Sequence, residues 1–356
     1  MKHTIWFGLL LLASGQAASA QPADNLTDQQ KLGRQVFAQS CGVCHLPPSL
    51  GAKTYGPPLN KDAGGGGSPF AIDTNGNLYV ATGGAGCPGS KYQGCIAIFS
   101  PGALKPSKTI LLPVGYTVDA LAFDRAGNLY VSNDGPGGGT IAVYAPATGK
   151  LVRTITAGIA APLCIAFDRS GNLYVGNGNQ YFPRNKPDTI TIYPPGSSKP
   201  ARTIVISRTW GLPVHLAIDR AANLYVAANP LSNALPGAVL LFAPGATTPK
   251  LAISRKPQAY HAGPIALDSA GRLYVAYFFG SVGFVTIYAP ASARQLLQIG
   301  AGGHIPIAIA LDSVNRIYIG WNFARVNVYA PMSSAAIRSI ARGIDPELSG
   351  IEIGPN

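Results

Sequence analysis

Apolar and polar residues alternate in short runs along most of this chain, and one such run occurs six times. Two clear copies are IDTNGNLYVA from Ile72 and FDRSGNLYVG from Phe167, in which apolar segments flank an Asp-x-x-Gly-Asn sequence. Asp can accept hydrogen bonds from its own backbone two residues on, and Gly and Asn tolerate a positive φ, so this phrase predicts a tight β-hairpin. Its Asp recurs at Asp73, Asp124, Asp168, Asp219, Asp268 and Asp312, in steps of 51, 44, 51, 49 and 44 residues.

Each repeat divides into four strand-like segments, which is the pattern of a β-propeller blade. In the second repeat we expect strands over 120–123, 129–132, 141–145 and 151–156, with a Tyr-Ala-Pro turn after the third. The fold class predicted is therefore all-β, a six-bladed β-propeller. Seven blades remain an alternative, because segment 350–354 arrives 42 residues after Asp312, on the same period, as a closing strand or the stub of a lost blade.

A small residue stands at the same place in every repeat, two residues before the repeated Asp. On a strand near the propeller axis the blades converge, and a small side chain fits the taper there. These residues are Ala71, Ala122, Ala166, Ala217, Ala266 and Ala310.

The composition supports a turn-rich β protein and argues against nucleic-acid binding. The chain is 47% hydrophobic, with 43 Gly and 30 Pro among 356 residues. Its net charge of +12 reflects few acids, since only 12% of residues are charged and no Lys/Arg run occurs. A weak attraction to anionic surfaces is all that this charge predicts.

The first 20 residues predict a secretory signal peptide. A basic start at Lys2 precedes an apolar stretch over 5–13, and Ala18-Ser19-Ala20 provides a small-residue cleavage site. No later stretch approaches 18 apolar residues, so we do not expect a membrane-spanning protein. The mature protein is expected in the periplasm or outside the cell.

Residues 21–62 carry the most recognisable chemistry in the chain. An amphipathic helix is expected over 24–40, and it leads into Cys41-Gly42-Val43-Cys44-His45. A C-x-x-C-H sequence predicts covalent haem attachment, with two thiols forming thioethers and His45 as an axial iron ligand. The alternative is a decayed remnant in which Cys41 and Cys44 form a disulfide or remain thiols. A zinc site is disfavoured, because no second Cys/His pair lies nearby.

This segment resembles the first half of a class I cytochrome c over about residues 26–60. The resemblance rests on Gly33-Arg34-Gln35-Val36-Phe37, on the C-x-x-C-H sequence and on Gly56-Pro57-Pro58-Leu59. It implies that the carbonyl of Pro57, 12 residues after His45, accepts a hydrogen bond from the ligand imidazole. The rest of such a domain, including a nearby distal Met, is missing, and a Gly-rich linker over 63–68 leads into the repeats.

Residues 69–356 resemble the NHL and SMP-30-like propeller families, whose blades contain a similar Asp, Gly-Asn and Tyr-Val phrase. SMP-30-type lactonases hold a divalent metal at the axis with Glu, Asn and Asp ligands. This chain has no matching early Glu motif, so a divalent metal is considered but not favoured. The resemblance implies the fold much more strongly than it implies an activity.

Four residues fall in, or at the end of, the loops that enter the expected inner strands, and they form the candidate site of the propeller. Such loops open on the face that usually binds ligands. A site there could use histidine as a general base, as a metal ligand or as the distal haem ligand. The alternative is that the histidines are simply solvated. The four residues are Asp119, His215, His261 and His304.

The remaining cysteines suggest a structural role. Cys87 and Cys95 bracket a Pro/Gly loop in the first blade, and a disulfide between them is expected in an exported protein. Cys164 falls on an expected inner strand, where a buried, inert thiol is predicted.

Three functions fit these observations. The favoured one is an exported c-type haem-binding protein, not an enzyme, that transfers electrons and whose propeller binds a redox partner or ligand as a monomer. The first alternative is an SMP-30/gluconolactonase-like hydrolase or lyase with a vestigial cytochrome segment. The second is a cofactor-free propeller that acts as an interaction scaffold.

Overall fold

The computed structural model describes residues 70–340, apart from 74, 76, 83–93, 101–105, 114, 136, 147, 179–186, 231–234, 256–259, 301–303, 312–313 and 322–324. Several predictions fall outside this part of the chain: the signal peptide, the helix over 24–40, the linker, segment 350–354, and the residues Cys41, Cys44, His45, Pro57 and Cys87.

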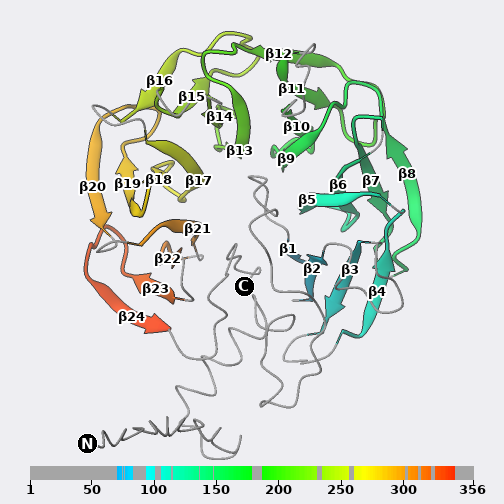
Figure 1. The fold of residues 1–356 in the computed structure, drawn as a ribbon, viewed down its shortest axis with the longest axis horizontal. Helices are drawn as coiled ribbons and strands as arrows, with labels where there is room; N and C mark the ends of the chain where they lie inside the picture. Colours follow the sequence, from blue (N-terminus) through cyan, green and yellow to red (C-terminus); the bar gives the residue numbers. More distant parts are fainter. Residues whose placement is uncertain are drawn as a thin grey trace, which may run out of the picture.

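The described residues form six four-stranded antiparallel sheets, arranged as blades around a central axis (Figure 1). This confirms the all-β, six-bladed propeller predicted from the repeats. Blade 1 contains β1 (Phe70–Ile72), β2 (Leu78–Thr82), β3 (Cys95–Phe99) and β4 (Lys108–Leu111), and blade 2 contains β5 (Thr117–Phe123), β6 (Leu129–Asp134), β7 (Thr140–Tyr144) and β8 (Leu151–Ile155). Blade 3 contains β9 (Pro162–Phe167), β10 (Leu173–Asn177), β11 (Asp188–Tyr193) and β12 (Arg202–Ile206), and blade 4 contains β13 (Leu212–Ile218), β14 (Leu224–Asn229), β15 (Ala238–Phe242) and β16 (Leu251–Ser254). Blade 5 contains β17 (His261–Leu267), β18 (Leu273–Phe279), β19 (Val282–Tyr288) and β20 (Gln295–Gly300), and blade 6 contains β21 (Pro306–Leu311), β22 (Ile317–Trp321), β23 (Arg325–Tyr329) and β24 (Ala336–Ile340).

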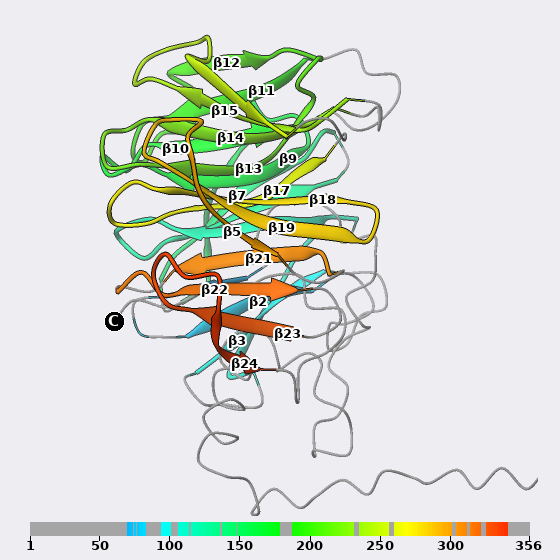
Figure 2. The same cartoon turned by 90° about the vertical axis from the view of Figure 1, so that its left-hand side faces the viewer.

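The first strand of each blade lies nearest the axis, and neighbouring inner strands from β1 to β21 contact one another in chain order. All inner strands therefore begin on the same side of the disc, which we call the mouth face. The hairpins between first and second strands, and the turns between third and fourth strands, lie on the opposite side, the turn face. Figure 2 shows the disc edge-on, with the β18–β19 hairpin extending from the mouth face at the right.

The repeated Asp organises the first hairpin of blades 1 to 5 on the turn face. In blade 2, Asp124 Oδ1 accepts hydrogen bonds from the backbone N–H groups of Ala126 (2.9 Å) and Asn128 (2.8 Å), while Oδ2 accepts one from Asn128 Nδ2 (2.8 Å). Gly127 has the left-handed φ of 81° that such a three-residue hairpin requires. The same bonds recur at Asp73, Asp168 and Asp219, and at Asp268 the side chain of Arg272 replaces the Asn amide.

The alanines predicted near the axis lie there, and each is the register partner of the repeated Tyr on the second strand. Ala166 pairs with Tyr174 and Ala266 with Tyr274, and the other repeats follow the same rule. The hydroxyl of Tyr274 then reaches the repeated Asp268 at 3.2 Å. We infer that the small residue leaves room for the ring that links the second strand to the turn.

Separate apolar cores join successive blades from blade 1 to blade 6. Between blades 5 and 6, for example, Tyr274 and Val285 pack in one cluster with Ile309 and Trp321. Equivalent clusters lie between the other neighbouring blades from blade 1 to blade 5. Since each interface buries many aliphatic and aromatic side chains, the described part of the disc is a rigid frame for its two faces. It contains no helix long and apolar enough to cross a membrane.

Because the Asp side chain satisfies two backbone N–H groups and one side-chain amide, we predict that Asp124→Ala lowers the free energy of unfolding by about 2–3 kcal/mol. Urea unfolding followed by circular dichroism would measure this loss. The neighbouring Arg125→Ala is the control, since its exposed side chain should change stability by less than about 0.5 kcal/mol. Equal effects of the two substitutions would contradict the role given to the Asp.

Candidate functional site

Every inner strand from blade 2 to blade 6 has a break in register near its start on the mouth face. The break leaves Asp119, Leu163, Val214 and Ile307 outside the pairing in four blades, and Gly263 with Pro264 in blade 5. A β-bulge of this kind re-aims a side chain without ending the strand, which is why β5 begins three residues earlier than predicted. Asp119 is the one acidic residue among these bulge positions.

Asp119 lies in an unusual environment for a carboxyl group. Burial, and secondly the negative charge of the nearby Asp134, raise the pKa of Asp119 to about 7. Its Oδ2 is buried and accepts no hydrogen bond from the residues described. Asp134 is itself only 4% exposed. At neutral pH, therefore, Asp119 is about half protonated and can donate or accept a proton.

The three candidate histidines lie near the starts of consecutive inner strands, but in different surroundings. His215 lies within β13, where burial lowers its pKa to about 4, so its imidazole is neutral at pH 7. His261 begins β17 and stacks on Phe278, with ring centroids 5.3 Å apart and an interplanar angle of 23°; burial lowers its pKa as well. His304 is half-buried in the segment before β21.

The structure does not bring these candidates together in a metal site. Within the described ranges, no group of three or more His, Cys, Asp or Glu side chains is placed to hold a metal ion. Asp119 has Asp134 as its close acidic neighbour, whereas the histidines belong to blades 4 to 6. In its described part, the mouth face thus offers separate ionisable groups and no compact set of them.

Two asparagines that end second strands, Asn177 and Asn229, are structural on this face. Asn229 accepts a hydrogen bond from Ala262 N and donates one to Ala262 O, both at 2.8 Å, so it ties blade 4 to blade 5. Asn177 is 1% exposed and binds Ala160 N and Gly158 O in the loop that enters β9. These amides hold the loops of the mouth face in place and are not available to a ligand.

An aromatic hairpin in blade 5 was not predicted from the sequence. Strands β18 and β19 are seven residues each and pair up to Phe279 and Val282, which leaves a two-residue turn. At its tip Phe279 is 45% and Val282 51% exposed. Below them Tyr260 contacts Phe284 edge-on at 5.0 Å. We call Phe278, Phe279, Val282 and Phe284 the blade 5 hairpin tip.

The signal for this hairpin was present but ambiguous. The phrase Tyr277-Phe278-Phe279 continues the apolar run directly after the repeated Leu-Tyr-Val-Ala, where other repeats turn to Asn or Gly. Such a run fits an extended strand or a buried loop equally well. Only the pairing of Phe279 with Val282 shows that it projects from the mouth face.

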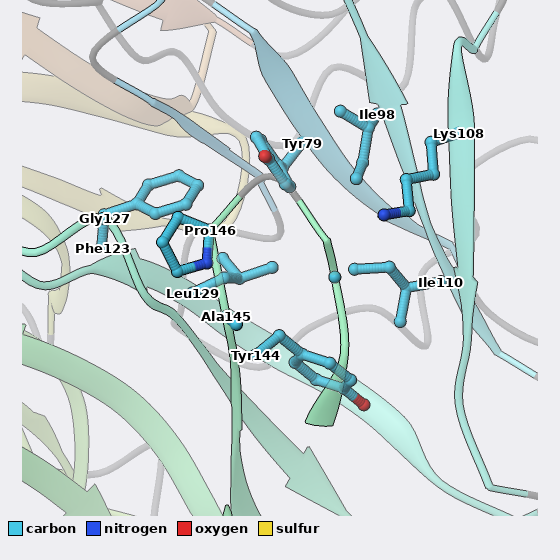
Figure 3. A pocket seen from close by; sticks show the side chains of 11 residues that line it. Tyr79, Ile98, Lys108, Ile110, Phe123, Gly127, Leu129, Tyr144, Ala145 and Pro146 are labelled. Carbon is cyan, nitrogen blue, oxygen red and sulfur yellow. The ribbon is translucent and has the colours of Figure 1, made fainter. Parts of the chain in front are cut away.

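On the turn face, a small cavity lies between blades 1 and 2 (Figure 3). Tyr79, Phe123, Ile110 and Pro146 line it, and the Lys108 ammonium group, beside it, donates a hydrogen bond to the carbonyl of Thr148. Its volume of about 20 Å³ accommodates roughly one water molecule. It is too small to bind a substrate.

The described cysteines are both buried. Cys164 is free and 3% exposed, its Sγ donates a hydrogen bond to the carbonyl of Pro213 at 3.3 Å, and burial raises its pKa. It is therefore the inert thiol that was predicted. Cys95 is disulfide-bonded at the start of β3. The pairing with Cys87 remains a prediction, because Cys87 lies outside the described residues.

Comparison with known proteins supports the fold. No protein-family model matches this chain, and no curated protein does. A chain of Kuenenia stuttgartiensis hydrazine synthase superposes with a TM-score of 0.57 and 15% identity, over 74% of this chain and 76% of that one. A chain in the crystal structure of a mitotic checkpoint complex superposes with a TM-score of 0.63 and 13% identity, over 84% of each chain. This chain shares the β-propeller fold with them. Identities this low show nothing more.

Burial of Asp119 predicts a pH-dependent stability. Its pKa rises on folding from about 4 to about 7, so folding favours the protonated form and stability falls as the pH increases through this window. We expect Asp119→Asn to be more stable than the wild type by about 2–4 kcal/mol above pH 7, with the difference vanishing near pH 4.

Urea unfolding at several pH values would measure this effect. Asp119→Leu, which copies the residue at the same bulge in blade 3, is the matched variant and should also lose the pH dependence. An undiminished pH dependence in the Asn variant would show that Asp119 is not its source.

Proposed function

We propose that this chain is an exported c-type haem protein whose propeller binds a partner, and that electron transfer is its role. The observation that carries the proposal is the sequence Cys41-Gly42-Val43-Cys44-His45 with Pro57 placed 12 residues after the His. Two cysteines one helical turn apart can form thioethers with both vinyl groups, and the adjacent His45 can bind the iron. When bound, haem supplies a one-electron redox centre.

The residues around this sequence support attachment over a bare cysteine pair. A carbonyl acceptor at Pro57 would hold the imidazole of His45 in one orientation and make it a stronger ligand. The predicted signal peptide would deliver the chain to the compartment where c-type haem is attached. The location proposed is the periplasm or the cell exterior.

The mouth face supports a binding role for the propeller. Its loops are held by Asn177 and Asn229, and its blade 5 hairpin tip presents Phe279 and Val282 to solvent. Aromatic and aliphatic anchors on a rigid support cost little conformational entropy on binding, and such residues dominate protein interfaces. We place the partner's contact at this hairpin tip.

Fold similarity alone does not decide between binding and catalysis. By their names, one of the similar solved chains belongs to a synthase and the other to a checkpoint complex. Propellers support both kinds of function, so the function has to be argued from the residues.

We predict that protein exported from a host with c-type haem maturation retains haem on a denaturing gel stained for peroxidase activity. Cys41→Ala/Cys44→Ala should lose the stain while keeping its β-type circular dichroism and thermal transition. Cys164→Ala is the matched thiol control and should keep the stain, since the equivalent residue in blades 2 and 6 is already Ala. A wild-type protein without covalent haem would refute the proposal.

A second function, an SMP-30-like hydrolase or lyase, is favoured by one observation. Asp119 has a pKa of about 7, as a general acid or base at neutral pH requires, and it lies on an inner strand at the mouth face. In that case the N-terminal segment is a vestige.

This alternative predicts lactone hydrolysis whose rate increases with pH through about 7, as Asp119 loses its proton. Asp119→Asn should lower kcat at least about 100-fold, with no loss of stability at the assay pH. A panel of sugar lactones, assayed with and without added divalent metal, tests it. If the wild type turns over none of them, the hydrolase alternative loses its support.

A further inference from the structure

The positive charge of this chain is not spread evenly over the described part of the disc. On the turn face, the residue after the repeated Asp is Arg in three consecutive blades, at Arg125, Arg169 and Arg220. The turn between third and fourth strands ends in a lysine, or carries one near its end, in the same blades, at Lys150, Lys199 and Lys250. All six side chains are exposed. We call these six residues the basic arc.

The carboxylates of the same turns do little to offset this charge. Asp124, Asp168 and Asp219 lie beside the arc, and each accepts at least three hydrogen bonds from its own hairpin. Counted together, the six cations of the arc and these three carboxylates leave a net charge of +3. The cations are at the exposed tips, whereas the carboxylates are directed into the turns.

Within blades 2 to 4, the other described acids lie toward the opposite face. Asp119 is near the start of β5, Asp134 ends β6 and Asp188 begins β11, and all three positions belong to the mouth face. The two faces of the disc therefore differ in charge. An anionic surface that approaches the molecule will be attracted to the turn face of blades 2 to 4.

The shape of the arc favours a flat partner. Its residues come from two sets of equivalent turns in neighbouring blades, and both sets lie on the turn face of the disc. The cavity beside it holds about one water molecule and offers no pocket for a side chain. A laterally uniform anionic surface matches this repeated pattern of exposed cations better than a shaped protein surface does.

We propose that the basic arc docks the turn face onto the surface of a bilayer that contains anionic phospholipid. Arg guanidinium groups bind phosphate oxygens in a bidentate manner, and each basic residue near such a surface contributes about 1 kcal/mol. The disc then lies flat on the bilayer, and the blade 5 hairpin tip projects away from it. This inference does not depend on haem attachment.

The test is sedimentation of the full-length mature protein with vesicles of phosphatidylcholine, with or without about one third phosphatidylglycerol. We expect binding only to the anionic vesicles at low salt, and loss of binding in about 0.5 M NaCl, where the Debye length is about 4 Å. Arg169→Gln/Arg220→Gln should weaken the partitioning about 25-fold, at about fivefold per charge.

The control is Arg208→Gln/Arg255→Gln, which removes the same charge from segments that lead into inner strands on the mouth face. It should weaken partitioning less than about threefold. Equal losses in both double variants would mean that net charge alone acts, and would overturn the proposal. So would equal binding to neutral vesicles, or competition by soluble polyglutamate at an equal charge concentration, which would indicate an acidic protein partner.

Discussion

The carboxylate of the repeated Asp is the interaction on which the rest of the propeller depends. It satisfies backbone N–H groups that a hairpin leaves unpaired, and its second oxygen binds an amide and the Tyr of the next strand. In blades 1 to 5 these bonds hold the first two strands in register without using a residue of another blade. The repeated Tyr that reaches this carboxylate is the register partner of the repeated Ala on the inner strand. The bond to the Tyr therefore favours a small residue at that position of the inner strand.

Much of this could be predicted from the sequence, because the phrase contains its own partners. Asp124 and Asn128 lie only four residues apart, so both partners of their hydrogen bonds belong to the same short sequence motif. Asn229 and Ala262 are 33 residues apart and belong to different blades, so nothing local indicates that they bind. Asp119 was selected as a loop acid, but its neighbour Asp134 and its place at a bulge shared with Leu163 depend on register. The blade 5 hairpin tip was missed for a related reason, since an apolar run does not reveal where pairing ends.

The two faces of the disc follow from the same repeat in different ways. Turn-face residues belong to the phrase itself, so a cation placed after the Asp recurs from blade to blade and produces the basic arc. Mouth-face residues follow the ends of the phrase, where the repeats diverge in length and composition. The turn face, whose residues recur from blade to blade, suits a uniform surface. The mouth face, whose residues differ between blades, suits a specific partner. A haem protein that transfers electrons to a partner would benefit from such a division, with one side for location and the other for recognition.

The register break near the start of the inner strand in blades 2 to 6 has a consequence for how such a protein can change. A residue that the register break leaves outside the strand pairing can be substituted without changing a backbone hydrogen bond of the sheet. The free-energy cost of such a substitution therefore depends mainly on the burial of the new side chain. Blade 3 has Leu at this point, blade 4 Val, blade 5 Gly with Pro, and blade 2 a carboxyl group that is half protonated at neutral pH. The axis of the propeller is thus surrounded by independent sites of substitution, each anchored by an unchanged hairpin below it. New chemistry can be introduced at one of them while the neighbouring blades keep their packing.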